Sequence, residues 1–203
     1  MQISHRALSN FLHGMSREPG LSPQDRLLAV TTISFDIAAL ELYLTLINGA
    51  CVVLASREAT VDALQLQRLL DEQRITAMQA TPATWQMLVN SGWTGKQDLR
   101  IFCGGEALPR NLARELLARS RELWNLYGPT EATIWACVAR VDEHGGSGPV
   151  SRASMNTAIR PWCRSANRWT TRGSTCWTTT ASRYHWASRA SCTSVVCKWP
   201  AAT

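Results

Sequence analysis

No stretch of this 203-residue sequence is apolar over the ~20 consecutive residues that a membrane-spanning helix requires. The first ten residues lack the hydrophobic core of a secretory signal peptide. The seven cysteines show no even, closely spaced pattern, which argues against a disulfide framework. These absences argue against a membrane-spanning chain and a small disulfide-bonded secreted domain. We therefore expect a protein of the reducing cytoplasm, without a membrane partner.

A further set of absences is confined to residues 144–203, which contain no Asp, Glu, Leu or Phe. The same segment holds eight of the 21 Lys and Arg, five of the nine Trp and four of the seven Cys. Residues 1–143 carry all 15 acidic residues, so the net charge of +6 comes from the tail. We expect one folded unit over residues 1–143 and a basic tail over 144–203, irregular or disordered after about residue 150.

Residues 1–143 show an alternation of short apolar runs and amphipathic segments that is typical of an α/β fold. This rhythm predicts a layered, mostly parallel sheet with flanking helices. Ligands bind such sheets at the carboxyl ends of the strands, so the loops after residues 31, 80, 103 and 126 are expected to hold the chemistry. The predicted strands are 27–31, 51–54, 75–80, 99–103 and 122–126, and the predicted helices are 4–13, 35–47, 61–73, one from Pro82, and 109–119.

Three motifs follow these strands in order: SFDIAALELYLTLINGA from Ser34, IFCGGEAL from Ile101 and NLYGPTEATI from Asn125. Taken singly each is weak, because Tyr-Gly-Pro is usually a turn and Gly-Gly-Glu a helix entry. In this order and spacing they resemble the core motifs of the adenylate-forming, AMP-binding enzymes. Within that superfamily they resemble the amino-acid adenylation domains of nonribosomal peptide synthetases. The resemblance covers residues 3 to about 141, the middle part of a much longer domain.

The resemblance implies attack of an amino-acid carboxylate on the α-phosphate of ATP, with Mg²⁺ and release of pyrophosphate. The aminoacyl adenylate then passes to the phosphopantetheine thiol of a peptidyl carrier protein. By the same resemblance Tyr127 stacks on adenine, Asn125 bonds its exocyclic amine, and the catalytic candidates Thr130 and Glu131 hold the α-phosphate and Mg²⁺. The implied ATP-binding set is Gly104, Gly105, Glu106, Asn125, Tyr127, Gly128 and Thr130, and the glycines would let main chain lie against the purine.

Asp36 is a carboxylate in the apolar setting SFDI, where an unpaired buried charge is costly. The resemblance supplies a partner, the α-ammonium of the amino-acid substrate; the alternative is an N-cap for the helix that follows. The positions that match the family's specificity-determining set are Asp36, Ile37, Leu40, Gln79, Ile101, Cys103, Leu126, Ile134 and Trp135. This set resembles that of glycine-activating domains, with Cys103 in place of a more usual glycine. Large side chains leave little room, so glycine is the expected substrate and alanine the nearest competitor.

The tail departs from the family pattern after Val141. Read one base out of frame, residues 162–203 can be translated to contain GELYIGG and VARGY, two segments at family-like spacing. We therefore predict a frameshift between about residues 142 and 161. His185 and the four tail cysteines, Cys163, Cys176, Cys192 and Cys197, lack the CxxC spacing of a zinc site.

The family's phosphate loop is expected upstream of Met1, and its catalytic Lys after the frame break, so this chain alone is expected to be inactive. Two other readings stay open: a pseudo-enzyme fragment that binds nucleotide, and a nucleic-acid-binding protein that uses the basic tail. An acyl-CoA-type ligase is the rival within the enzyme class, and Asp36 argues against it because a plain carboxylic acid has no ammonium group.

Overall fold

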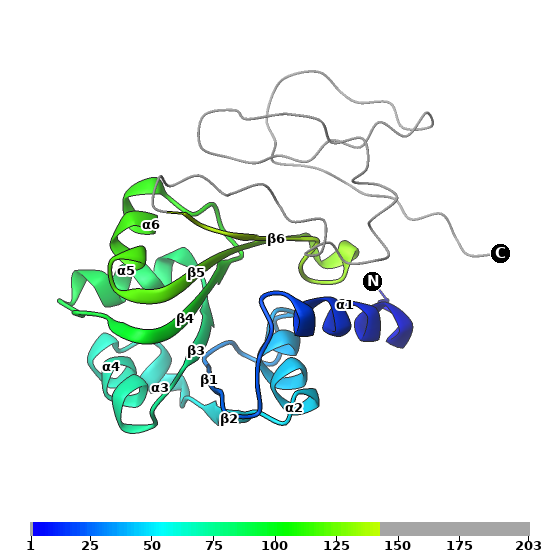
Figure 1. Cartoon of the computed structure of the whole chain (residues 1–203), viewed down its shortest axis with the longest axis horizontal. Helices are drawn as coiled ribbons and strands as arrows, with labels where there is room; N and C mark the ends of the chain where they lie inside the picture. The colour runs from blue at the N-terminus through cyan, green and yellow to red at the C-terminus, as the bar shows by residue number, and fades with distance from the viewer. Residues whose placement is uncertain (1, 143–203) are drawn as a thin grey trace, which may run out of the picture.

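The computed structural model describes residues 2–142 (Figure 1). The predictions for the tail, including its frame and its irregularity after about residue 150, lie outside these residues. Within the described part of the chain, no helix is both long and apolar enough to cross a membrane.

Six strands form one sheet in the order β2-β1-β3-β4-β5-β6. The first five strands run parallel to one another, and β6 is antiparallel to β5. The prediction of a mostly parallel α/β sheet is therefore confirmed. The strands are β1 (Arg26–Ala29), β2 (Cys51–Leu54), β3 (Ala77–Ala80), β4 (Lys96–Gly104), β5 (Ser120–Tyr127) and β6 (Cys137–Arg140).

Helices cover both faces of the sheet, with α1 and α2 on one side and α4, α5 and α6 on the other (Figure 1). The helical elements are α1 (His5–Arg17), η1 (Leu40–Leu44), α2 (Thr45–Ile47), α3 (Arg57–Thr60), α4 (Ala63–Glu72), α5 (Pro82–Asn90), α6 (Arg110–Leu117) and η2 (Thr130–Ala132). Here η1 is a π-helical turn and η2 a 3₁₀ turn.

Local chemistry fixes several helix starts. The hydroxyl of Ser4 accepts the backbone N–H of Ala7 at the start of α1. The Asp62 carboxylate accepts two backbone N–H groups at the start of α4. Pro82 opens α5, where its missing N–H costs nothing. Capping of this kind stabilises a helix by about 1 kcal/mol.

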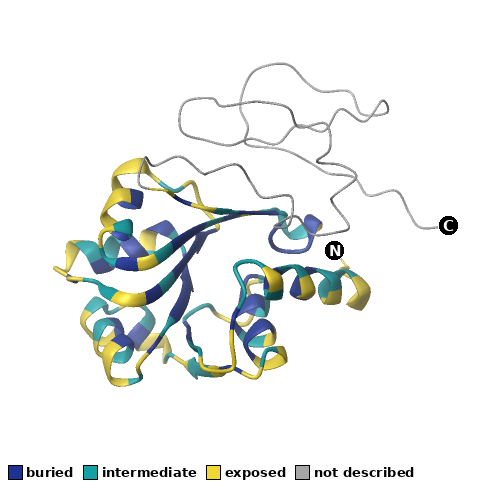
Figure 2. Cartoon of the chain, viewed as in Figure 1, coloured by how far each residue is buried: buried dark blue, intermediate teal, exposed yellow. Residues whose placement is uncertain are grey.

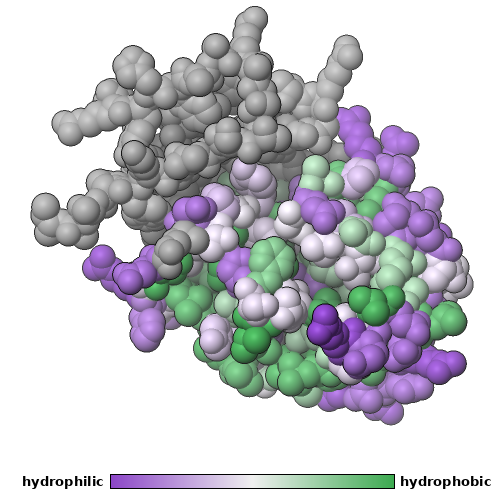
Figure 3. Space-filling model, turned by 180° about the vertical axis from the view of Figure 1, so that it is seen from behind, coloured by the Kyte–Doolittle hydropathy of each residue, from purple (hydrophilic) through white to green (hydrophobic). Residues whose placement is uncertain are grey.

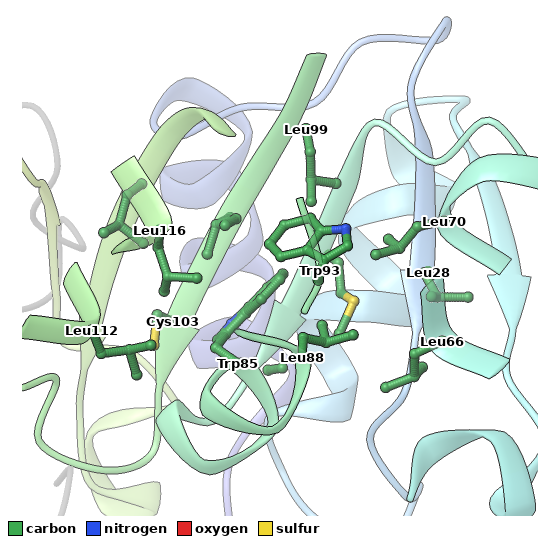
Figure 4. Packing of buried hydrophobic residues seen from close by; sticks show 14 of the residues in the cluster. Leu28, Leu66, Leu70, Trp85, Leu88, Trp93, Leu99, Cys103, Leu112 and Leu116 are labelled. Atoms are coloured by element: carbon green, nitrogen blue, oxygen red, sulfur yellow. The ribbon is translucent and has the colours of Figure 1, made fainter. Parts of the chain in front are cut away.

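The sheet separates two hydrophobic clusters, and both are buried (Figure 2). The first cluster lies under α4, α5 and α6; it contains Trp85 and Trp93, whose ring centroids are 6.1 Å apart (Figure 4). The second cluster lies under α1 and η1 and includes Phe11, Leu40 and Phe102. We call them the helix-side cluster and the site-side cluster, because the second contains most of the predicted amino-acid-binding residues.

Two features differ from the sequence predictions. The helix expected over 35–47 begins later and contains the π turn η1. Strand β6 was not predicted. At the other edge of the sheet, β2 leaves Cys51 exposed. Exposed apolar side chains lie nearby in sequence, on η1, α2 and β2, and hydrophobic surface is visible on the face shown in Figure 3.

Asp25 and Arg100 form an ion pair near the amino ends of the strands, with 2.8 Å between Oδ2 and the guanidinium. Asp25 also accepts hydrogen bonds from the Thr76 hydroxyl and from the backbone and hydroxyl of Ser22. Arg100 donates in addition to the Gly20 carbonyl at 2.9 Å. Burial alone would raise the pKa of Asp25, but these hydrogen bonds and the charge of Arg100 lower it overall.

Candidate active site

The carboxyl ends of β3, β4 and β5 meet at one edge of the sheet. Ala80 pairs with Cys103, and Gly104 pairs with Leu126, so the three strands end within a few residues of one another in register. The loops after residues 80, 103 and 126 therefore lie together. This edge is where a parallel α/β sheet binds ligands.

The structure brings six of the nine predicted amino-acid-binding side chains together on the site-side face of the sheet. Five of them belong to the site-side cluster and are at most 6% exposed. Gln79 is fully buried and is joined to the others by hydrogen bonds. These six residues are Ile37, Leu40, Gln79, Leu126, Ile134 and Trp135.

A chain of hydrogen bonds links Trp135, Gln79 and Glu41. The Trp135 indole N–H donates to Gln79 Oε1 at 3.0 Å. Gln79 Nε2 donates at 2.9 Å to Glu41 Oε1 and also at 2.9 Å to the carbonyl of Ile37. Burial raises the pKa of Glu41, although donors from Thr31, Gln79 and Val30 favour its carboxylate form. Glu41 was not among the predicted site residues; its signal in the sequence is a charged residue on the buried stripe of an otherwise apolar helix.

Trp135 packs directly against the backbone of Gly104. A Cβ placed on Gly104 would lie 2.7 Å from Trp135 Cη2 and 2.6 Å from the carbonyl oxygen of Leu126. No side chain fits at this position while the indole keeps its place. The indole therefore fills the space over the end of β4.

The turn that contains Ile134 and precedes Trp135 has a strained backbone conformation. Thr133 and Ile134 have φ of 65° and 71°, a conformation that β-branched residues seldom adopt. Each such residue costs on the order of 1–3 kcal/mol unless the surroundings hold it. The backbone N–H of Ala136 bonds to the carbonyl of Tyr127 at 2.9 Å and anchors the turn to the end of β5. Gly128 is needed there, because a Cβ would lie 2.5 Å from the Ile134 carbonyl oxygen.

Two predicted residues, Ile101 and Cys103, lie on the opposite face of the sheet, in the helix-side cluster (Figure 4 labels Cys103). Their assignment to the amino-acid pocket is corrected. Side chains alternate along a strand, so a shift of one residue moves a side chain to the other face. The residues of β4 that face Gln79 and Leu126 are Phe102 and Gly104, which pair with them in register. At this end of β4, the residue on the site-side face is therefore Gly104 and not Cys103.

Burial raises the pKa of the Cys103 thiol to about 12, with a smaller contribution from the charge of Glu106. A thiol in that state is a small apolar side chain at neutral pH. Cys103 therefore belongs to the packing under α6 and not to the chemistry at the strand ends.

Asp36 lies in the loop before η1, next to Ile37, and is half-buried. Its side chain makes no hydrogen bond and no ion pair with any residue in the range 2–142. The alternative role of Asp36 as an N-cap is therefore not seen. A half-buried carboxylate beside the six clustered side chains can accept a cationic group.

The predicted ATP-binding residues lie on the ends of β4 and β5 and in η2. Asn125 and Tyr127 alternate with Leu126 along β5, so they lie on the opposite face of the sheet from Leu126. Tyr127 is 48% exposed at the strand end. Gly105 follows β4 with φ of 88° and is exposed together with Glu106.

Thr130 and Glu131 occupy η2, directly after Gly128 and Pro129. Glu131 is exposed, and no cluster of three or more His, Cys, Asp or Glu that could bind a metal is present within the described residues. A single carboxylate fits Mg²⁺ that arrives with a nucleotide, because Mg²⁺ usually takes one or two carboxylates together with substrate phosphates.

Comparisons with known proteins agree with this architecture. The model of the AMP-binding enzyme family matches residues 1–160. The chain is 44% identical to a dimodular nonribosomal peptide synthase of Bacillus subtilis over 158 residues, which is 77% of this chain and 7% of the relative. It is 48% identical to a PKS-NRPS hybrid synthetase of Aspergillus candidus over 140 residues, 68% of this chain and 6% of the relative. The chain thus spans less than a tenth of either relative.

Solved structures give the same result. A four-domain nonribosomal peptide synthetase bound to AMP and glycine superposes with a TM-score of 0.68 at 43% identity, over 71% of this chain and 11% of that one. An adenylation domain of Vibrio cholerae in complex with glycyl-adenosine-5'-phosphate superposes with a TM-score of 0.65 at 25% identity, over 73% and 28%. The chain belongs to the AMP-binding enzyme family, and its relatives are adenylation domains of nonribosomal peptide synthetases.

Proposed function

We propose that this chain is part of an adenylation domain that activates glycine as glycyl-AMP. The observation that carries the proposal is the packing of the Trp135 indole on the backbone of Gly104, 2.7 Å from where a Cβ would stand. With the indole held there by Gln79, the amino-acid side of the site has little volume left for a substrate side chain. Two solved relatives carry glycine or glycyl-AMP, which supports the same substrate.

Asp36 supports an amino acid over a plain carboxylic acid. Its carboxylate lies beside Ile37 without a partner among the described residues, and an α-ammonium group would neutralise it. A hydrogen bond between two charged groups contributes about 1.5–3 kcal/mol, which is enough to select amino acids over their deaminated analogues.

On the other face, we assign ATP to the ends of β4 and β5. Tyr127 supplies an exposed ring for the adenine and Asn125 a carboxamide for its amine. Gly105 lets the main chain approach the purine, while Thr130 and Glu131 take the α-phosphate and Mg²⁺. Side chains alternate along β5, so the end of this strand contributes to both binding sites. Leu126 faces the amino acid, and Asn125 and Tyr127 face ATP.

In the reaction, an oxygen of the glycine carboxylate forms a bond to the α-phosphorus of ATP, and the bond to the pyrophosphate oxygen breaks. Catalysis of this step is mostly positioning and charge neutralisation. The carrier-protein thiolate then attacks the glycyl carbonyl, and AMP leaves. The residues described here bind and orient the two substrates on opposite faces of the strand ends.

Titration of the full chain with glycyl-, alanyl- and leucyl-sulfamoyl adenosine, stable mimics of the adenylates, tests this function. We expect the glycyl compound to bind most tightly, the alanyl compound more weakly and the leucyl compound not at all. D36N should weaken the glycyl mimic roughly 10- to 100-fold and leave AMP unchanged. D98N, which removes an exposed carboxylate paired with Lys96, is the control. Leucyl binding as tight as glycyl binding would refute the glycine assignment, and binding of AMP alone would leave only a nucleotide-binding fragment.

We further propose that the boundary near residue 143 separates this adenylation-domain unit from a tail translated out of frame. The change in composition lies there, and the family match ends at residue 160, inside the interval of the predicted frameshift. Sequencing the DNA across codons 140–165 tests the proposal. A stop codon in the alternative frame between residues 162 and 203 would contradict it.

A further inference from the structure

Glu41 is a fully buried carboxylate with no ion pair to any residue within 2–142. Its Oε2 accepts the backbone N–H groups of Val30 and Thr31 at 3.0 and 3.1 Å. Its Oε1 accepts the Thr31 hydroxyl and, at 2.9 Å, the Gln79 side-chain amide. Three of these four groups can only donate, so both oxygens are needed as acceptors.

Glu41 thereby helps to fix the orientation of the Gln79 carboxamide, together with the Ile37 carbonyl. The Gln79 NH₂ group faces two acceptors, Glu41 Oε1 and the Ile37 carbonyl, while its oxygen faces the indole N–H of Trp135. In the flipped orientation an oxygen would face two acceptors and an NH₂ group would face a donor. All three contacts would then be repulsive, in a site that water does not reach.

The orientation of Gln79 also affects Trp135, which follows two residues in an unfavourable backbone conformation. Thr133 and Ile134 precede it in the left-handed region, which is unfavourable for both side chains. The indole is fixed by its bond to Gln79 and by its contact with Gly104. A hydrogen-bond relay thus runs from the end of β1 through η1 and β3 to the loop before β6.

We propose that Glu41 is a positioning residue of the amino-acid side of the site. Its buried carboxylate holds Gln79 in the one orientation that accepts the Trp135 indole N–H, and so keeps the indole over Gly104. This inference rests on the proposed function for its consequence in substrate selection. The relay itself can be tested without any ligand.

The test is the E41Q variant of the full chain, labelled with ¹⁵N at the tryptophan indoles. A glutamine at position 41 must present NH₂ either to Gln79 and Thr31 or to the two backbone N–H groups. We expect the Trp135 indole N–H, assigned by its loss in W135F, to exchange with solvent at least tenfold faster. The indole signals of Trp85 and Trp93, in the helix-side cluster, should not change.

The matched control is T45V. Thr45 donates from its hydroxyl to the backbone carbonyl of Glu41, so this change perturbs the same buried turn without touching the carboxylate. T45V should leave the Trp135 exchange rate within twofold of the original. An equal acceleration in T45V and E41Q, or none in E41Q, would overturn the proposal.

If E41Q does not fold, comparing the variants Q79E and E41Q/Q79E tests whether Glu41 and Gln79 are coupled. Q79E places two carboxylates against each other, whereas the double variant restores a donor at position 41 and keeps an acceptor for the indole. We expect the double variant to be more stable to urea than Q79E and to slow Trp135 exchange at least fivefold relative to it. Additive effects of the two changes would contradict the relay.

The role of Glu41 in selecting glycine over alanine is tested by the ratio of the affinities for glycyl and alanyl sulfamoyl-adenosine. We expect this ratio to fall at least fivefold in E41Q and to be unchanged in T45V. If the original chain binds neither compound, the proposed function fails, while the indole exchange still tests the relay. If the chain binds both and the ratio is the same in E41Q, the positioning role of Glu41 is refuted and the proposed function stands.

Discussion

Trp135 donates its indole N–H to the side-chain oxygen of Gln79 at 3.0 Å, between two residues 56 positions apart in the sequence. The bond joins the end of β3 to the loop before β6, and it places the indole on the backbone of Gly104. A polar group buried this deeply is costly when it loses its partner. We therefore expect loss of this contact to change both the stability of this edge of the sheet and the free volume of the proposed amino-acid site.

The W135F variant tests how the indole limits the substrate. The change leaves Gln79 Oε1 without a donor and vacates part of the space over Gly104, so we expect a loss of about 1–3 kcal/mol in stability to urea. The affinity for alanyl sulfamoyl-adenosine should rise relative to the glycyl compound by up to about tenfold, the scale of one methyl group in an apolar pocket.

The control for this variant is W124F. Trp124 lies in the same site-side cluster, on β5, but donates its indole N–H to the partly buried Glu122 carboxylate. It should leave the alanyl-to-glycyl ratio unchanged. An equal shift of the ratio in both variants would mean that the indole of Trp135 does not set the volume.

The G104A variant tests the close approach of the two backbones at this point. The added methyl group would lie 2.6 Å from the Leu126 carbonyl oxygen and 2.7 Å from the Trp135 ring, so strand or indole must shift. We expect a destabilisation of about 1–3 kcal/mol in urea, typical of overpacking, and loss of glycyl sulfamoyl-adenosine binding.

G92A is the contrasting control, because a Cβ on Gly92 meets no atom within 4 Å, although its φ is 85°. Its cost is only that of backbone strain, about 1 kcal/mol, and binding should persist. Retained binding in G104A would show that the indole is free to move away from β4.

Much of the fold could be predicted because its signals are local. Strand β2 was predicted with its observed bounds, and Pro82 marks a helix start that the structure confirms. The three motifs follow strands whose carboxyl ends the structure brings to one edge of the sheet. The order of strands and the antiparallel β6 were not predicted, because they depend on pairing between distant segments.

The predicted amino-acid-binding set failed at Ile101 and Cys103 for a related reason. Position within a motif does not reveal which face of the sheet a side chain occupies, and a single-residue shift reverses it. Pairing of Gln79 with Phe102 and of Leu126 with Gly104 shows the correct parity. Glu41 was missed because its place on the buried stripe of the predicted helix does not reveal its donors, which lie 10 to 38 residues away in sequence.

The different surroundings of Cys51 and Cys103 predict different reactivity. With its pKa raised to about 12, Cys103 has about 10⁻⁴ of its population as thiolate at pH 8 and is buried as well. Iodoacetamide at pH 8 should therefore label the exposed Cys51 long before Cys103, as measured by mass spectrometry of the tryptic peptides. C103A should leave the alanyl-to-glycyl ratio unchanged, because its side chain faces the helix-side cluster. If C103A changed the alanyl-to-glycyl ratio, Cys103 would have to be part of the amino-acid site.

The ion pair of Asp25 with Arg100 predicts how stability depends on pH. The folded-state pKa of Asp25 is below its ordinary value of 3.8, so the folded chain releases this proton more readily than the unfolded chain. The stabilisation by the Asp25 carboxylate is therefore complete above pH 3.8 and is lost as the pH falls through the folded-state pKa.

We expect D25N to be less stable than the original chain by about 1–3 kcal/mol at pH 6, because Arg100 stays buried and loses its charge partner. The difference between the two chains, measured by urea unfolding, should shrink as the pH is lowered below 4. Glu41 also affects how stability depends on pH, and its raised pKa acts in the opposite direction to that of Asp25. Both chains contain Glu41, so its effect cancels in the difference between their stabilities. A difference that stays constant from pH 6 to pH 3 would show that the Asp25 carboxylate does not stabilise the amino ends of the strands through its charge.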